Sequence, residues 1–207
     1  MASFLGAARW RAEEEFARRV NCSPMNRPRA VILALSFAAL ATARAGPPTL
    51  LLPIPNARIP IPGVLSGGQP TQDQIASAGA AGYKTVINLR PDTEPGFDWE
   101  PAAVRAMGMD YVSIPVSGPT GLTKDTVVRL DAALKAAAAK GPVLFHCASG
   151  NRVGALLALR AVWLEGKDAA AALAYGQASG LTGLEPTVKS LLGLAEPVAA
   201  PPAPAPR

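Results

Sequence analysis

Short apolar runs of strand character alternate along this chain with longer segments of helical character, and this alternation restricts the fold more than any other feature. The runs that suit buried strands are rich in β-branched and other apolar residues; they are YKTVINLR (83–90), DYVSIPV (110–116) and PVLFHC (142–147). The segments with helical spacing or helix-ending glycines lie at about 100–107, 124–141 and 151–166. Strands that alternate with helices in this way predict an α/β fold of three layers, in which helices flank a mainly parallel sheet of about four to five strands.

Proline-rich segments lie on both sides of this alternating region and set the predicted domain boundaries. Residues 46–62 contain PPTLLLPIPNARIPIP and predict an extended lead-in, and residues 196–207 predict a disordered Pro/Ala-rich tail. The predicted domain therefore covers residues 63–195. Its first helix is predicted to start after Thr71, where Gln74 at the third helical position completes a capping box.

The N-terminal part of the chain has the features of a secretory signal peptide. From Met25, two arginines precede an apolar run (30–41), which is followed by a small-x-small cleavage pattern at 43–45. The run is shorter than the roughly 20 residues that span a bilayer. We therefore predict a signal peptide at 25–45, a periplasmic or secreted protein, and no stable membrane insertion after cleavage; the alternative is an uncleaved anchor. Residues 1–24 are interpreted as an upstream extension.

The positive charge of the chain belongs to this leader and not to the predicted domain. Residues 1–45 carry seven Arg and three Glu, which leaves 13 of the 20 basic and 12 of the 15 acidic residues for 46–207. That remainder is nearly neutral and shows no basic patch with interleaved aromatic residues. We therefore predict no nucleic-acid partner.

One segment, LFHCASGNRVG (144–154), holds the only histidine of the sequence, His146, beside one of its two cysteines, Cys147. The other cysteine, Cys22, lies in the upstream extension, so the mature chain has a lone thiol and no internal disulfide. The segment leaves a predicted strand and enters a predicted helix. Ligands of parallel sheets bind at this kind of position, beyond the carboxyl end of a strand.

The residue types in this loop suit an anion and a nucleophile. A strand–loop–helix turn directs several backbone N–H groups and the positive end of a helix dipole to one point, and Gly150 allows the amides to turn inward. Such a site binds an anion and stabilises the thiolate form of Cys147. Arg152, in the first helical turn, can bind two oxygens of an oxyanion through its planar fork. The alternative is a buried structural cysteine beside an ordinary surface arginine.

Two further residues each have two interpretations. His146 either orients the loop through hydrogen bonds of its ring or is a packed core residue. Arg90, at the end of TVINLR, either supports the site or pairs with Asp92 or Glu94, since exposed ion pairs are common.

HCASGNR resembles the phosphate-binding loop of cysteine-dependent phosphatases of the dual-specificity type. Together with LSGGQPTQDQIASAGAAGYKTVINLRPDTE (65–94), it resembles the bacterial family called beta-lactamase hydrolase-like or protein-tyrosine-phosphatase-like, over about residues 60–175. The resemblance implies a cysteine-phosphatase fold and a phosphoester substrate, either a phosphoprotein or a small molecule. It makes Cys147 the nucleophile that forms a thiophosphate and Arg152 the phosphate clamp. The implied amide cradle consists of Ala148, Ser149, Gly150 and Asn151. We predict no cofactor and no metal ligand.

Three departures from the phosphatase pattern predict weak activity. Four residues separate Cys147 from Arg152 where the phosphatase loop normally has five, and Val153 stands where a Ser or Thr hydroxyl helps the thiolate leave. No carboxylate lies at 116–123, and the nearest candidate for a catalytic acid, Asp125, equally suits the first turn of the following helix. Two other functions stay open: a rhodanese-like sulfurtransferase, whose loop has the same four-residue spacing, and a non-catalytic anion-binding module.

Overall fold

The computed structural model describes residues 51–194. The predicted upstream extension (1–24), the signal peptide (25–45) and the tail (196–207) therefore lie outside the described residues.

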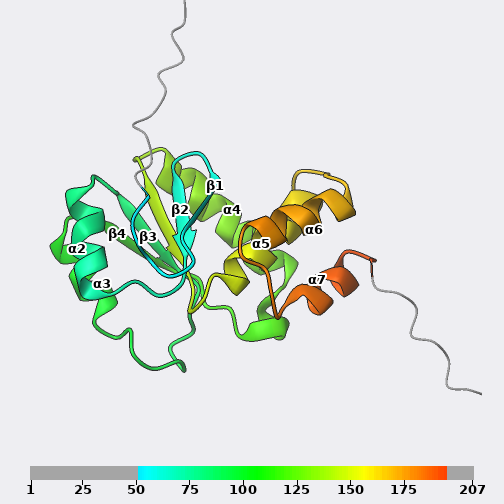
Figure 1. Cartoon of the computed structure of the whole chain (residues 1–207), viewed down its shortest axis with the longest axis horizontal. Coiled ribbons are helices and arrows are strands. Elements are labelled where there is room, and N and C mark those ends of the chain that lie inside the picture. The colour runs from blue at the N-terminus through cyan, green and yellow to red at the C-terminus, as the bar shows by residue number, and fades with distance from the viewer. Residues whose placement is uncertain (1–50, 195–207) are drawn as a thin grey trace, which may run out of the picture. The chain divides into compact units, whose positions relative to one another are not determined.

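Within the described residues, five strands form one sheet (Figure 1). The strands are β1 (Arg58–Ile61), β2 (Val64–Gly67), β3 (Thr85–Asn88), β4 (Asp110–Ser113) and β5 (Val143–His146). Their order in the sheet is β1-β2-β5-β3-β4, and only the β1–β2 pair is antiparallel. The predicted mainly parallel sheet is confirmed. The proline-rich lead-in contributes more than expected, because part of it pairs with β2 as the edge strand β1.

Helices follow the strands as the sequence pattern predicted. They are α2 (Gln72–Ala80), α3 (Glu100–Ala106), α4 (Lys124–Ala138), α5 (Asn151–Trp163), α6 (Ala169–Ala178) and α7 (Glu185–Leu191), with a 3₁₀ turn η1 (Gly118–Gly121) before α4. The predicted capping box of the first of these helices is present, since Thr71 accepts from the Gln74 amide and Gln74 Oε1 accepts from the Thr71 amide.

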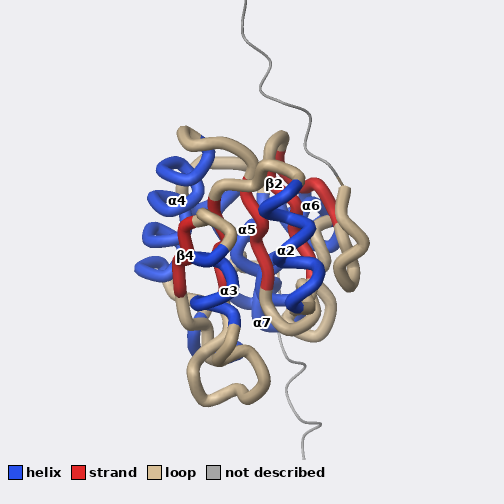
Figure 2. Tube along the Cα trace, turned by 90° about the vertical axis from the view of Figure 1, so that its left-hand side faces the viewer, coloured by secondary structure: helices blue, strands red, loops and turns tan. Residues whose placement is uncertain are grey.

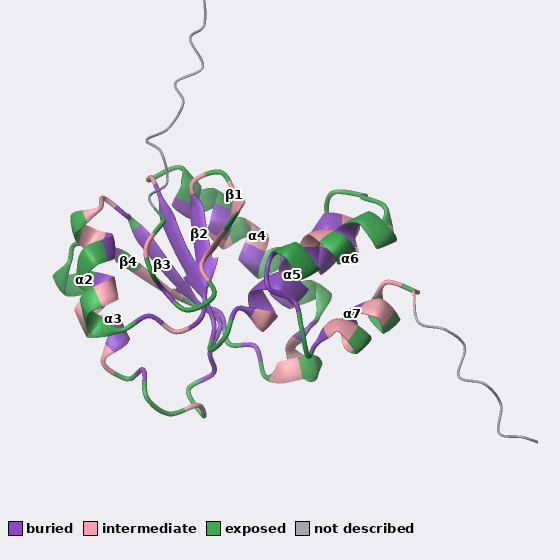
Figure 3. Cartoon of the chain, in the orientation of Figure 1, coloured by how far each residue is buried: buried purple, intermediate pink, exposed green. Residues whose placement is uncertain are grey.

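The strand side chains alternate between two hydrophobic clusters, one on each face of the sheet. In β5, Leu144 packs in the cluster with α2 and α3, whereas Val143 and Phe145 pack in the cluster with α4 and α5. Figure 3 shows the central strands buried between these layers, and in Figure 2 α2 and α3 lie in front of the strands. The period of two in each strand thus determines which helix layer each residue faces.

Close packing of α5 and α6 requires a glycine at their crossing. A Cβ atom at Gly154 would lie 2.2 Å from Leu181 N and 2.5 Å from Gly176 O, both backbone atoms that cannot rotate away. This contact fixes α5, whose first residue follows the Cys147 loop. Among the described helices, none has the length and apolar character needed to cross a membrane.

Candidate active site

Cys147 directly follows β5 and lies at the carboxyl edge of the sheet, below the start of α5. Its side chain is fully buried. Gly150, the residue that precedes α5, has φ of 91° and directs its amide to Cys147 Sγ at 3.1 Å. This left-handed conformation favours glycine. The predicted loop therefore has an amide aimed at the sulfur, as an anion-stabilising turn requires.

Other amides of the loop are not used by the fold. Within the described residues, no hydrogen bond engages the N–H groups of Ala148, Ser149, Asn151 or Arg152. The loop is instead held from outside through its carbonyls: Ala148 O accepts from the Gln69 amide at 3.1 Å, and Ser149 O accepts from Asn56 Nδ2 at 3.0 Å. The backbone carbonyls thus hold the loop in place, and its backbone N–H groups remain available to bind an anion.

The Asn151 side chain does not contribute to this cradle. Its Oδ1 accepts from the backbone amides of Thr182 (2.8 Å) and Leu184 (3.3 Å). Asn151 therefore ties the start of α5 to the segment before α7, and only its backbone remains for an anion.

Arg152 is buried and held by a carboxylate from a distant loop. Its Nη1 donates to Glu94 Oε1 at 2.6 Å and to Val116 O at 3.0 Å, and its Nη2 donates to Glu94 Oε2 at 3.0 Å. Burial acts to lower the pKa of the Arg152 guanidinium, but the Glu94 hydrogen bond and the nearby Cys147 outweigh it, so the pKa is raised. The hydrogen bond from Arg152, with help from Arg90, lowers the pKa of Glu94. The pair is therefore ionised at neutral pH.

Arg90 supports the loop that carries Glu94. It donates from Nε to Glu94 Oε2 (2.8 Å), from Nη1 to Gln69 Oε1 (2.8 Å) and from Nη2 to Pro95 O (2.7 Å). Its guanidinium also lies 4.6 Å from the centre of the Phe97 ring. Arg90 therefore fits both of its interpretations: it forms an ion pair with Glu94, and through Glu94 it supports Arg152.

His146 lies on the opposite face of β5 from Cys147, as the alternation of strand side chains requires. Its Nδ1 lies 3.2 Å from Cys147 O, and since a carbonyl only accepts, this nitrogen carries a proton. Its Nε2 lies 2.9 Å from Oε1 of Glu100, a fully buried residue, although the angle is poor for a hydrogen bond. His146 is therefore both packed and polar, and it contacts the backbone of Cys147.

Glu100 gathers a buried polar cluster behind the loop. Its Oε2 accepts from Asn88 Nδ2 at 2.8 Å, and its Oε1 accepts from Gln69 Nε2 at 3.2 Å. Asn88 Nδ2 also donates to Tyr111 Oη at 2.9 Å, and burial raises the pKa of Tyr111 to about 12. The cluster connects β3, β4, β5 and α3 at the edge of the sheet where the loop begins.

Asp125 lies apart from this assembly. It is an exposed residue in the first turn of α4, and none of the hydrogen bonds or ion pairs within the described residues joins it to Cys147 or Arg152. The segment 114–123 (IPVSGPTGLT) offers the loop no carboxylate, only the carbonyl of Val116. Within 51–194, no three or more His, Cys, Asp or Glu side chains gather in a way that could hold a metal ion.

Sequence reasoning left two carboxylates without a role at the site. Glu94 was considered only as a partner of Arg90, and Glu100 was assigned no role. A usable signal was present for Glu100, because Asn88 and His146 interrupt apolar strands with polar side chains on one face. Such positions require a buried partner.

Curated relatives match this chain in sequence, and solved structures share its arrangement of elements. The relatives include beta-lactamase hydrolase-like proteins from Xylella fastidiosa (41% identical over 99 residues, 46% of this chain) and Agrobacterium fabrum (44% over 96 residues, 44% of this chain). The chain spans only 22% of the length of each.

Among solved structures, a DUF442 protein of Shewanella putrefaciens CN-32 is 28% identical, with a TM-score of 0.55 over 68% of this chain and 91% of that one. TpbA of P. aeruginosa, solved with phosphotyrosine, is 22% identical, with a TM-score of 0.54 over 73% and 90% of the two chains. This second likeness shows the cysteine-phosphatase fold.

Residues 61–163 match the family described as beta-lactamase hydrolase-like protein, phosphatase-like domain. These residues include β2 to β5, the Cys147 loop, Arg152 and Glu94. The described domain therefore belongs to the phosphatase-like domain family of the beta-lactamase hydrolase-like proteins.

Proposed function

We propose that this domain is a cysteine-dependent phosphatase that hydrolyses phosphomonoesters through a Cys147 thiophosphate. The observation that carries the proposal is how Arg152 is held. A guanidinium has five N–H donors. Glu94 and the Val116 carbonyl take both donors of Nη1 and one donor of Nη2.

The two donors that remain are Nε–H and the second N–H of Nη2. They lie on one side of the guanidinium and form the second fork with which arginine binds a phosphate. Glu94 thus fixes the plane of Arg152 through one fork and leaves the other for substrate. The Cys147 contribution to the raised pKa of Arg152 supports this orientation, because it places the sulfur close to the guanidinium.

The free amides of the loop complete the anion site. Ala148, Ser149, Asn151 and Arg152 retain backbone N–H groups that no described residue uses. Donors that are fixed before substrate arrives stabilise the charge of a transferring phosphoryl group at little reorganisation cost.

The reaction follows from these positions. The Cys147 thiolate attacks phosphorus, the S–P bond forms, and the ester P–O bond breaks with its electron pair on the leaving oxygen. Water then attacks the thiophosphate, the P–S bond breaks, and phosphate and the thiolate are released. Arg152 holds two phosphoryl oxygens through both steps.

The surroundings of the loop favour aryl esters. No carboxylate lies in segment 114–123 to protonate a departing oxygen, and a general acid typically contributes about 10²–10⁴-fold. An aryloxide leaves without such help far more readily than an alkoxide. We propose aryl phosphates of the phosphotyrosine type as the substrate class, which is also the ligand in the TpbA structure. We further propose that the domain acts after export, in the periplasm or as a secreted protein.

The test is hydrolysis of p-nitrophenyl phosphate by the purified chain, with thiosulfate plus cyanide as a parallel substrate. The expected result is slow phosphate release that Cys147→Ser abolishes and Cys22→Ser leaves unchanged. Denaturing mass spectrometry of rapidly quenched enzyme is expected to show a phosphoryl adduct on Cys147. Sulfur transfer much faster than phosphate release would favour the sulfurtransferase instead, and binding of vanadate without turnover would favour the anion-binding module.

A further inference from the structure

A pocket lies at the opposite end of the sheet from Cys147. It has a volume of about 550 Å³, within the range of small-molecule sites. Its floor includes Val64, the first residue of β2, whereas the other end of β2 pairs with His146 beside the nucleophile. The pocket is therefore separate from the Cys147 loop and from the function proposed for it.

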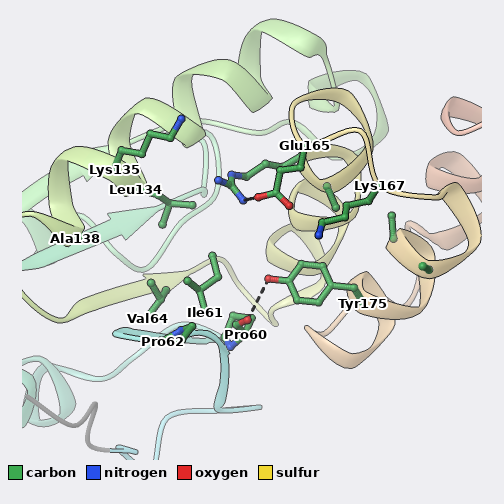
Figure 4. A pocket seen from close by; sticks show the side chains of 14 residues that line it. Pro60, Ile61, Pro62, Val64, Leu134, Lys135, Ala138, Glu165, Lys167 and Tyr175 are labelled. Carbon is green, nitrogen blue, oxygen red and sulfur yellow. Dashed lines mark hydrogen bonds and ion pairs between the residues drawn. The ribbon is translucent and has the colours of Figure 1, made fainter. Parts of the chain in front are cut away.

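Four elements supply an apolar wall. The β1–β2 hairpin contributes Ile61 and Val64, α4 contributes Leu134, and α6 contributes Ala172; Figure 4 shows Leu134 opposite Ile61 and Val64 across the space. None of these side chains offers a hydrogen bond. The body of a ligand in this pocket must therefore be apolar, because a polar group here would lose its water without a partner.

Charges occur at the rim, and most of them neutralise one another. Arg160 pairs with Asp131 at 2.8 Å and with Glu165 at 2.5 Å, and Lys135 pairs with the same Asp131 at 2.7 Å. Lys167 is the exception, because no ion pair within the described residues includes it. The residues that line the pocket include three cations and one carboxylate, Glu165, and Asp131 pairs with two of these cations from outside the lining. These five groups together leave an excess of one positive charge.

The position of Lys167 lets it act on the contents of the pocket. In Figure 4 its ammonium group points into the space between Glu165 and Tyr175. Tyr175 cannot take over this role, because its hydroxyl donates to Pro60 O at 3.1 Å and burial raises its pKa. Lys167 is therefore the cation of the pocket lining whose charge no described carboxylate neutralises.

We propose that this pocket binds an apolar molecule that ends in one carboxylate, such as a straight-chain alkyl carboxylic acid, with the chain along the apolar wall and the carboxylate at Lys167. The excess of one positive charge at the rim selects a single anionic group. The apolar wall selects an alkyl chain over a sugar or a nucleotide.

The test is calorimetric titration of the purified chain with saturated carboxylic acids of 8, 10, 12 and 14 carbons, and with the alcohols of the same lengths. Each added methylene that fits is expected to tighten binding about fourfold, from the free energy of burying a methylene. The carboxylates are expected to bind up to about fivefold more tightly than the alcohols, as a partly exposed ion pair allows. Lys167→Gln is expected to remove this preference and keep the dependence on chain length.

Two substitutions on α4 provide a matched pair. Ala138 lines the pocket at an exposed position, so Ala138→Trp fills the mouth without disturbing the core. Ala136 is equally exposed on the same helix and does not line the pocket. We expect Ala138→Trp to weaken binding at least tenfold and Ala136→Trp to bind as the parent does. The proposal is overturned if no saturable binding occurs, if both tryptophans act alike, or if the parent binds alcohols as tightly as carboxylates.

Discussion

Replacement of Glu94 by glutamine tests the proposal that a carboxylate 58 positions away in sequence orients Arg152 for phosphate binding. Glutamine keeps the shape of the side chain but removes its charge and turns an N–H₂ group toward donors of Arg152. Charge-assisted hydrogen bonds contribute about 1.5–3 kcal/mol where they are buried. The Glu94 side chain is 31% exposed, and solvent screening reduces that contribution to about 1–2 kcal/mol.

The assay is kcat/KM for an aryl phosphate, which reports the loss of transition-state stabilisation. A loss of about 1–2 kcal/mol corresponds to roughly a 5- to 30-fold decrease in kcat/KM. Asp92→Asn is the matched control, because Asp92 is an exposed carboxylate of the same loop with no contact to Arg152. We expect Asp92→Asn to retain nearly the parent rate.

The pH dependence adds a second criterion for the same substitution. The pKa of Glu94 is lowered from its ordinary value of 4.5, chiefly by the hydrogen bond from Arg152. The contribution of Glu94 is therefore fully present above pH 4.5 and is lost only as the pH falls through the lowered value. The ratio of parent to Glu94→Gln activity is expected to be constant above pH 4.5. It is expected to decrease as the pH falls through the lowered pKa of Glu94.

Two results would refute this reasoning. If Glu94→Gln is as active as the parent, Arg152 does not need its carboxylate partner. If Glu94→Gln is faster, the carboxylate competes with phosphate for Arg152, and the free fork that we infer does not exist.

The leaving-group dependence, two buried contacts and the proposed export can each be tested separately. Rates across phosphate esters are expected to fall steeply as the leaving-group pKa rises, equally in the parent and in Asp125→Asn; a flat parent series that becomes steep in the variant would make Asp125 the general acid. Gly154→Ala is expected to lower the free energy of unfolding by roughly 1–3 kcal/mol in urea titrations, since its methyl group overlaps Leu181 N; an unchanged midpoint would contradict this packing. Glu100→Ala is expected to cost about 1–3 kcal/mol in the same titration, because its buried polar partners lose their acceptor, and an unchanged midpoint would mean that water replaces the carboxylate. Intact-mass analysis of the protein from its native host is expected to show a chain that begins at Gly46; retention of residues 25–45 on a soluble cytoplasmic species would disprove export.

The layers of the fold could be predicted because their signals are local. Each strand is a short apolar run, each helix has a recognisable end, and the order of the two restricts the connections to a few arrangements. The capping box at Thr71 is an example, since both of its residues lie within one turn. The edge strand β1 was less predictable, because three prolines at 53–60 break the strand signal around Arg58.

The loop at Cys147 could be predicted for the same reason, but the partner of Arg152 could not. The sequence Cys-x₄-Arg lies between one strand and one helix, so its geometry follows from the local chain. Glu94 reaches Arg152 only because β3 and β5 are neighbours in the sheet, and the loop after β3 holds other carboxylates as well. The conformation of this loop determines which of its carboxylates reaches Arg152, and the local sequence does not determine that conformation.

The alternation of strand side chains also predicts that a buried polar partner such as Glu100 must exist. In β3 and β5, the residues that face α3 are Val86 and Asn88, and Leu144 and His146, so both strands end on that face with a polar residue. Asn88 and His146 are direct partners in the parallel register. Two polar side chains that are adjacent and buried need a shared partner from the helix above them. Glu100 is the residue of α3 that accepts from Asn88 Nδ2 and lies 2.9 Å from His146 Nε2. Because His146 Nδ1 also lies 3.2 Å from Cys147 O, the same carboxylate packs against the strand end that leads into the Cys147 loop.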